Sequence, residues 1–155
     1  MFDAAGPSVT QLSIAYRRLI AVTRMIIQMM DRSETSLGVA RAMIEAWRTL
    51  DWNRVVNLFS EDGVLQVVPL KPQVGRAAIK AHLDQVASGI ERLDFKIKHL
   101  NAVGHIVLFE RSDEFVYKGR SGSVPVVGVM EIADGHVKAW REYMDLATMS
   151  KAMGA

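Results

Sequence analysis

The chain has 155 residues, half of them apolar, which suits one compact domain with an ordinary core. Its 19 basic and 17 acidic residues give a formal net charge of +2 without a Lys/Arg block or a basic helix face, so nothing indicates nucleic-acid binding. The absence of Cys excludes disulfides and Cys-ligated metals, and the cytoplasm is the default location.

An amphipathic helix is predicted at the N-terminus. Arg24 and Gln28 interrupt its most apolar run, which is therefore too short to span a membrane. We expect the helix to pack on its own domain or on a partner subunit, since its polar face is not strongly basic, as a membrane-surface helix would require. It forms an extra segment, residues 1–35, before a single domain at residues 36–155. Its apolar residues recur at near-helical spacing: Leu12, Tyr16, Leu19, Val22, Ile26 and Met29.

Two further helices are predicted before the first strand. Residues 31–33, an Asp-Arg-Ser run, are expected to break the first helix. Thr35 or Ser36 can cap a second helix over about residues 37–50, and Asp51 can cap a short third one.

The remaining segments predict an α+β fold. A turn at residues 60–63, a strand at 64–70 and a helix at about 77–88 come first. The apolar pattern then changes to a period of two, which predicts strands at residues 93–103, 105–117, 124–132 and 136–144 and a helical tail at 146–153. This order favours helices covering one face of a curved, mostly antiparallel sheet, which is a cone whose interior suits a small apolar ligand.

Two predicted strands carry charged residues among apolar ones. Arg111 and Asp113 share one face of their strand with two phenylalanines, and Glu142 shares a face with Trp140 and Met144. Buried charge is costly unless it is paired, and in a curled sheet these three groups can meet. Two carboxyls beside one Arg can share a proton, as general acid–base chemistry needs. A purely structural ion-pair network inside the sheet is the competing interpretation.

The sequence offers little other chemistry. His99 lies in an apolar alternation and is expected at the core or its rim, whereas His82, His105 and His136 are expected to face solvent. Ser112 lies on the outer face of its strand, which argues against a Ser nucleophile. Neither metal-ligand spacing nor a glycine-rich phosphate loop is present, so no metal or cofactor is expected.

Four ordered segments resemble the limonene-1,2-epoxide hydrolase family, within the nuclear-transport-factor-2-like and SnoaL-like cone folds. The resemblance runs from about Ser36 to Ala147 and implies a six-stranded curved mixed sheet around a deep pocket, usually in a homodimer. The segments are VPLKPQVGR (68–76), LFERSD (108–113), VGVMEIADGHV (127–137) and WREYMDL (140–146).

The resemblance also implies a mechanism without a covalent intermediate. One carboxylic acid protonates the epoxide oxygen, a carboxylate deprotonates the attacking water, and an Arg bridges the two groups. The family's E-R-x-D motif assigns the acid to Asp113 and the bridge to Arg111, and its W-R-D-Y base corresponds to Glu142. The Tyr and Asn that hold the water in the family correspond to Leu65 and Val67, which cannot hydrogen-bond it through their side chains.

Glu142, Gln66, His99 or another polar group would therefore have to orient the water. We expect a cofactor-independent hydrolase of a hydrophobic epoxide such as a terpenoid. A SnoaL-like isomerase or cyclase acting on an apolar ring is the alternative that the missing water ligands favour, and a non-catalytic domain that binds an apolar metabolite or a partner protein is a third. The expected pocket residues are Leu65, Val67, Val86, Ile90, Phe95, Phe115, Val124, Val126, Trp140 and Met144.

Overall fold

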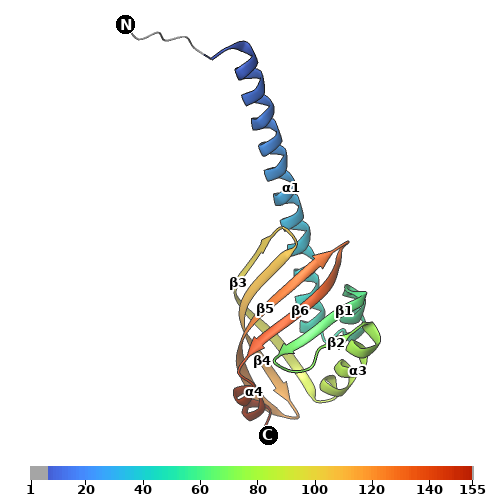
Figure 1. The fold of residues 1–155 in the computed structure, drawn as a ribbon. Coiled ribbons are helices and arrows are strands. Elements are labelled where there is room, and N and C mark those ends of the chain that lie inside the picture. Colours follow the sequence, from blue (N-terminus) through green and yellow to red (C-terminus); the bar gives the residue numbers. More distant parts are fainter. Residues whose placement is uncertain (1–6, 155) are drawn as a thin grey trace.

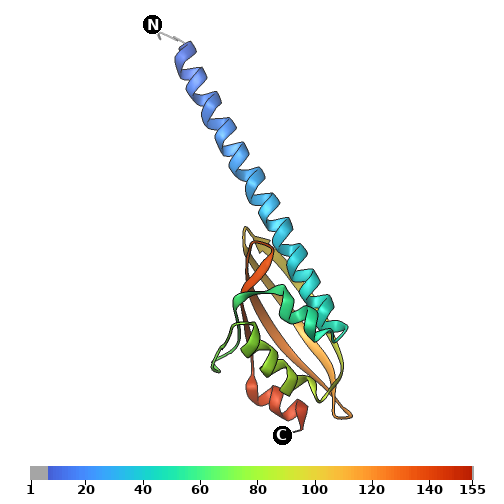
Figure 2. The same cartoon turned by 90° about the vertical axis from the view of Figure 1, so that its right-hand side faces the viewer.

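Helices occupy one side of a single twisted sheet in the computed structural model, which describes residues 7–154 (Figure 1). The side view shows α1, α2 and α3 against the same face of the sheet, with α4 at one end (Figure 2). In chain order the elements are α1 (Val9–Arg48), α2 (Trp52–Leu58), β1 (Phe59–Val68), β2 (Gln73–Val74), α3 (Arg76–Ala87), β3 (Ile90–Val103), β4 (Ile106–Tyr117), β5 (Arg120–Ala133), β6 (His136–Met144) and α4 (Leu146–Met153).

The six strands form one mixed sheet in the order β2-β1-β6-β5-β4-β3. β1 and β6 are parallel, and every other neighbouring pair is antiparallel. Asp134 and Gly135, with φ of 50° and 73°, form the turn between β5 and β6, as expected for a two-residue hairpin of this composition. The predicted α+β cone with a curved mixed sheet is confirmed.

The predicted break in the first helix is wrong, because α1 runs without interruption through residues 31–36. The hydroxyls that resemble caps are instead used inside the helix. Ser33 donates to the carbonyl of Met29 at 2.9 Å and Thr35 to that of Asp31 at 3.0 Å, so neither competes with the helical ladder.

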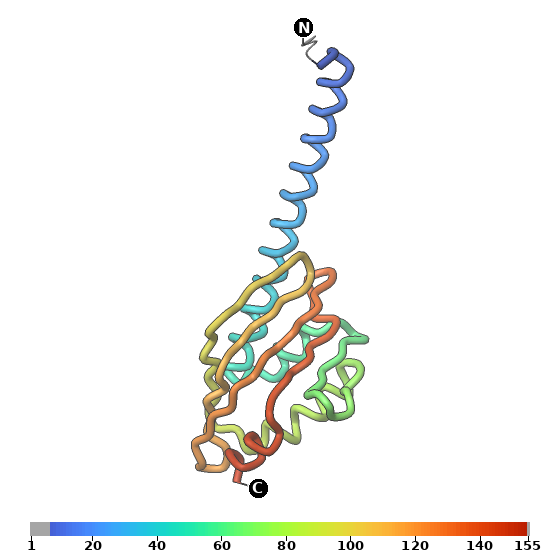
Figure 3. The backbone as a smooth tube through the Cα atoms, turned by 60° about the vertical axis from the view of Figure 1, so that its left-hand side comes forward, coloured from blue at the N-terminus to red at the C-terminus, as the bar shows by residue number. Residues whose placement is uncertain are grey.

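A second set of hydrogen bonds fixes α1 to the turn between β3 and β4. The hydroxyl of Ser36 donates to the carbonyl oxygen of Gly104, and the amide of Gly104 donates to the hydroxyl of Ser33, both at 2.9 Å. From here towards its C-terminus α1 packs on the core through Ala40 and Met43, which are fully buried. Towards its N-terminus it extends beyond the sheet, as all three views show (Figures 1 to 3).

The strand boundaries differ from the prediction at several places, among them the start of β5 at Arg120 rather than at residue 124. Residues 60–63, predicted as a turn, lie within β1, where the pairing with β6 is irregular between Phe59 and Val64. β3 begins at Ile90 rather than at residue 93. Among residues 7–154, no helix is both long enough and apolar enough to cross a membrane.

Candidate active site

A cavity of about 250 Å³ lies between the sheet and the helices. Most of its lining side chains are apolar, and three are the charged residues Arg111, Asp113 and Glu142. Its volume lies just below the roughly 300–1,000 Å³ of typical ligand pockets, so it suits a small, mainly apolar molecule. The lining residues are Trp47, Leu65, Val67, Leu70, His82, Val86, Ile90, Leu93, Phe95, Arg111, Asp113, Phe115, Tyr117, Trp140, Glu142, Met144, Leu146, Met149 and Met153.

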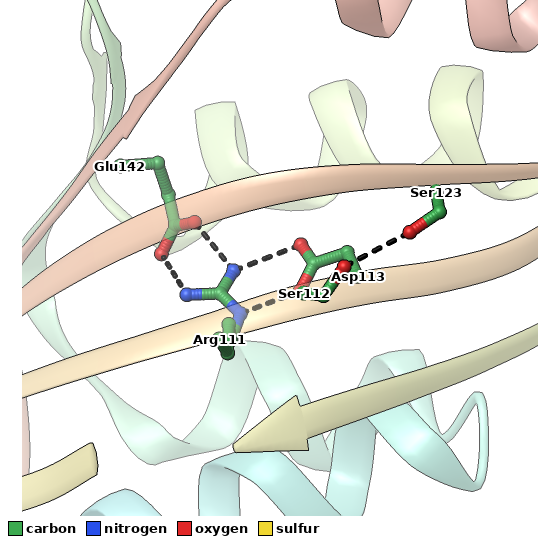
Figure 4. Close-up of polar contacts among 5 residues, drawn as sticks. All are labelled: Arg111, Ser112, Asp113, Ser123 and Glu142. Carbon is green, nitrogen blue, oxygen red and sulfur yellow. Dashed lines mark hydrogen bonds and ion pairs between the residues drawn. The ribbon is translucent and has the colours of Figure 1, made fainter. Parts of the chain in front are cut away.

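Arg111 bridges the two carboxyl groups in this cavity (Figure 4). Its Nε and Nη2 atoms donate to Asp113 at 2.6 and 3.0 Å, and its Nη2 and Nη1 atoms donate to Glu142 at 2.5 and 3.3 Å. Arg111 and Asp113 are two residues apart on β4 and therefore share a face. Glu142 comes from β6, which β5 separates from β4. The structure thus brings together the three residues that the two strand patterns indicated separately.

All three groups are almost completely buried, at 2% exposure for Arg111, 7% for Asp113 and 5% for Glu142. The guanidinium carbon lies 4.3 Å from the ring centre of Phe95 and 4.7 Å from that of Phe109. Aromatic faces attract cations, and this attraction is stronger where water is excluded. Pairing with both carboxyls and contact with two rings together offset the cost of burying the guanidinium.

Burial controls the protonation of both carboxyls. Desolvation raises the pKa of Glu142 to about 7, more than offsetting the opposing attraction of Arg111. Desolvation also raises the pKa of Asp113 above its usual range, again against the effect of Arg111. Loss of solvent opposes the charge on Arg111, but the two carboxylates outweigh it and raise its pKa. The site therefore has a permanent cation between two carboxyls, one of which binds a proton near neutral pH.

Gly128 makes room for this arrangement, although the sequence patterns did not single it out. It is the β5 residue that pairs with Glu142 on one side and with Phe109 on the other. A Cβ built there would lie 2.9 Å from Nη1 of Arg111 and in collision with the Phe109 ring. The sequence feature that could have identified Gly128 is its isolated position inside the predicted strand segment VGVMEI. An isolated Gly inside a strand often marks the close approach of another group.

The positions that hold water in the family are apolar in this cavity. Leu65 and Val67 both line it, and Val67 is the β6-register partner of Glu142. Of the two substitutes considered above, Gln66 donates its side-chain amide to the carbonyl of Leu70 at 2.9 Å, so it is engaged in the turn after β1. His99 is largely exposed, with 74% of its side chain accessible. Neither lines the cavity.

Two predicted lining residues lie elsewhere, and two polar residues were missed. Val124 and Val126 are buried in the core cluster rather than along the cavity. His82, expected to face solvent, lines the cavity from α3, as Tyr117 does from the end of β4. His82 precedes Val86 by four residues, so the predicted inward position of Val86 already placed both on one helix face.

Ser112 lies on the outer face of β4, as the strand parity predicts. Its hydroxyl hydrogen-bonds that of Ser123 at 2.9 Å (Figure 4).

Comparison with known proteins assigns the family. A model of the limonene-1,2-epoxide hydrolase catalytic domain matches residues 34–154. The chain therefore belongs to the limonene-1,2-epoxide hydrolase family, which confirms the resemblance seen in its sequence. Epoxide hydrolase EphG of Mycobacterium tuberculosis is 35% identical over 60 residues, which are 39% of this chain and 40% of that protein. The match thus spans about two fifths of the curated relative.

Solved structures share the fold. An epoxide hydrolase of Mycobacterium tuberculosis similar to limonene-1,2-epoxide hydrolase superimposes with a TM-score of 0.69 and 25% identity, covering 78% of this chain and 90% of that one. A proposed polyketide cyclase of Xanthomonas campestris gives a TM-score of 0.72 at 20% identity, covering 79% and 99% of the two chains. The second likeness establishes the fold alone, because cone folds of this kind carry several activities.

Proposed function

We propose that this protein is a cofactor-independent epoxide hydrolase that adds water to a small hydrophobic epoxide in one step. The observation that carries the proposal is the Arg111 bridge between two buried carboxyls in an otherwise apolar cavity. Family membership supports the same reaction. A terpenoid epoxide is the substrate class that fits the apolar lining.

In the proposed reaction Asp113 is the acid and Glu142 the base. Glu142 accepts a proton from a water molecule, whose oxygen forms a bond to one epoxide carbon. The bond between that carbon and the epoxide oxygen breaks, and Asp113 supplies the proton that the oxygen takes up. The product is a vicinal diol. The proton then resides on Glu142 instead of Asp113, and exchange within the carboxyl pair or with solvent restores the starting state.

The electrostatics of the site suit these roles. A general base works best when its pKa lies near the working pH, and burial raises the pKa of Glu142 to about 7. Burial also raises the pKa of Asp113, so the two carboxyls beside Arg111 can share one proton, and the proposed reaction begins with that proton on Asp113. Arg111 keeps its charge throughout and holds both carboxyls in place, so the reacting groups are already oriented when the epoxide binds.

Conversion of limonene oxide or styrene oxide to its diol tests the proposal. Asp113→Asn should abolish turnover, because the amide cannot donate an acidic proton. Asp94→Asn is the matched control: Asp94 lies on β3 in a surface ion pair with Lys96, so its loss should leave the rate unchanged. Full activity of Asp113→Asn, or no diol from a panel of apolar epoxides, would overturn the assignment.

One observation favours a second function, isomerisation or cyclisation of an apolar ring substrate. Leu65 and Val67 make the wall beside Glu142 apolar, where a hydrolase must hold water. A carboxyl pair that only transfers protons needs no bound water beside Glu142, so an apolar wall is compatible with isomerisation or cyclisation. Reaction in ¹⁸O-labelled water separates the two, because a diol gains one labelled oxygen and an isomer gains none.

A further inference from the structure

The N-terminal arm, residues 9–32 of α1, extends beyond the sheet and exposes apolar side chains. Eleven of its large apolar residues have exposed fractions between 47% for Ile14 and 84% for Val9. The hydrogen bonds of Ser33 and Ser36 to Gly104 mark the point where α1 leaves the sheet. Beyond it the arm extends for about 36 Å at 1.5 Å per residue (Figure 3).

A lone helix with this surface is poorly stabilised in water. Helical stability in proteins comes mainly from packing an apolar face, and the large apolar side chains of the arm are exposed in the single chain. Contiguous apolar surface exposed by a protein in water generally marks an interaction site. The arm therefore needs a partner that covers it.

The spacing of the apolar residues indicates what covers the arm. One row follows alternating steps of three and four residues, which is the a/d pattern of a helix that packs along another helix with heptad geometry. We call this row the arm seam. It consists of Leu12, Ala15, Leu19, Val22, Ile26 and Met29.

The charges leave the arm seam free to pair with itself. Residues 9–30 contain three arginines and no acidic residue. Arg17 and Arg24, seven residues apart, lie on the side of the helix opposite the seam. Arg18 borders the seam, but in a parallel pair it faces the position of Thr23 in the other helix, so no two cations meet.

We propose that the arm pairs through this seam with the arm of a second copy of the chain. Covering most of each large seam side chain and part of the flanking Val9, Tyr16, Met25 and Met30 buries on the order of 700 Å² per copy, near the roughly 800 Å² per partner of a standard-size interface. A lipid surface is the competing partner. It is disfavoured because the polar side is not strongly basic, with Ser13 and Gln28 beside the arginines, and because Tyr16 is the arm's one aromatic residue.

Particle mass, measured by sedimentation or light scattering of the full chain, tests the pairing. Leu19→Glu with Ile26→Glu puts two carboxylates in the seam and should halve the mass. Thr10→Glu with Gln28→Glu adds the same charge on the polar side and should leave the mass unchanged. A monomeric wild-type chain, or a seam variant with the wild-type mass, overturns the proposal. The catalytic proposal is unaffected by either result, because the arm lies outside the cavity.

A cross-linking experiment remains decisive if the seam variant misfolds. The chain has no Cys, so a single introduced thiol reports only its own contacts. Val22→Cys, on the seam, should form a disulfide-linked dimer under mild oxidation, whereas Gln28→Cys on the polar side should remain largely unlinked. Equal linkage of the two variants contradicts the seam. Binding of a monomeric chain to phosphatidylcholine–phosphatidylserine vesicles, lost in the Leu19→Glu and Ile26→Glu variant, would identify lipid as the partner and also overturn the proposal.

Discussion

Gly128 lies directly against Arg111, and a Cβ added to it would come 2.9 Å from Nη1 of the guanidinium. The same atom would collide with the Phe109 ring, on which the guanidinium also rests. Because Gly128 is the strand partner of Glu142, its missing side chain is what allows a residue of β4 to reach a carboxyl of β6 across the strand between them.

Gly128→Ala should therefore destabilise the protein and displace Arg111. Overpacking a filled core costs about 1–3 kcal/mol in the free energy of unfolding, which denaturant titration measures. Gly38→Ala is the matched control, because no atom lies within 4 Å of its added Cβ and Ala stabilises a helix relative to Gly by up to about 1 kcal/mol. Equal unfolding midpoints for Gly128→Ala and the wild type would show that the packing at Gly128 relaxes freely.

Arg111→Leu should be far more harmful than Arg141→Leu. The first leaves two buried carboxyls without their cation, and breaking a buried ion pair costs about 3–5 kcal/mol. The second removes a pair with Glu131 that is about one third exposed, for which less than about 1 kcal/mol is expected.

The unfolding free energies of the two Arg variants should be compared at pH 8 and pH 5. The loss in Arg111→Leu should be smaller at pH 5, because the unpaired carboxyls can then bind protons. Similar losses for Arg111→Leu and Arg141→Leu at pH 8 would mean that the buried bridge contributes little to stability.

Stability should fall as the pH rises from about 5 to about 7. Burial raises the pKa of Glu142 from 4.5 to about 7, so in this window the folded state binds a proton that the unfolded state has lost. The free energy of unfolding should decrease by on the order of 3 kcal/mol from this group and become level above the folded-state pKa. The raised pKa of Asp113 acts in the same direction.

Unfolding titrations at pH 5, 6, 7 and 8 check this slope. Glu142→Gln should flatten it, since the amide does not titrate. Carboxyls whose pKa is lowered in the folded state, such as Asp62 and Asp145, change the free energy of unfolding at more acidic pH. They therefore do not contribute to the slope expected from Glu142. An equal slope in the wild type and in Glu142→Gln would assign the titration to other groups.

Val67→Asn should accelerate hydrolysis if water orientation limits the rate. Val67 lines the cavity and is the register partner of Glu142, so an amide there can hold water beside the base. A gain of about 1.4 kcal/mol in positioning would raise kcat about tenfold with little change in KM. Val127→Asn, on the exposed outer face of β5, is the control. An unchanged kcat would show that water is already held by another group, such as the His82 imidazole that lines the same cavity.

Local sequence patterns were sufficient for most elements of the fold. The alternation of apolar residues located β4 to β6 within a few residues, because strand side chains must face the core at every second position. Local capping signals were misleading at residues 31–36, where Ser and Thr resemble helix caps but lie inside α1. Whether Ser36 caps a helix or continues one depended on Gly104, 68 residues away, which offers it a carbonyl.

The same distinction between local patterns and long-range contacts applies to the candidate site. Side-chain parity is a local property, so the strand pattern alone predicts that Arg111 and Asp113 share a face and that Glu142 faces inward on its own strand. That these faces meet could not be predicted from the sequence, because strand order, register and the open space at Gly128 are set by contacts between distant segments. The tertiary structure also turned His82 towards the cavity, since the side of a helix that is covered depends on what packs against it.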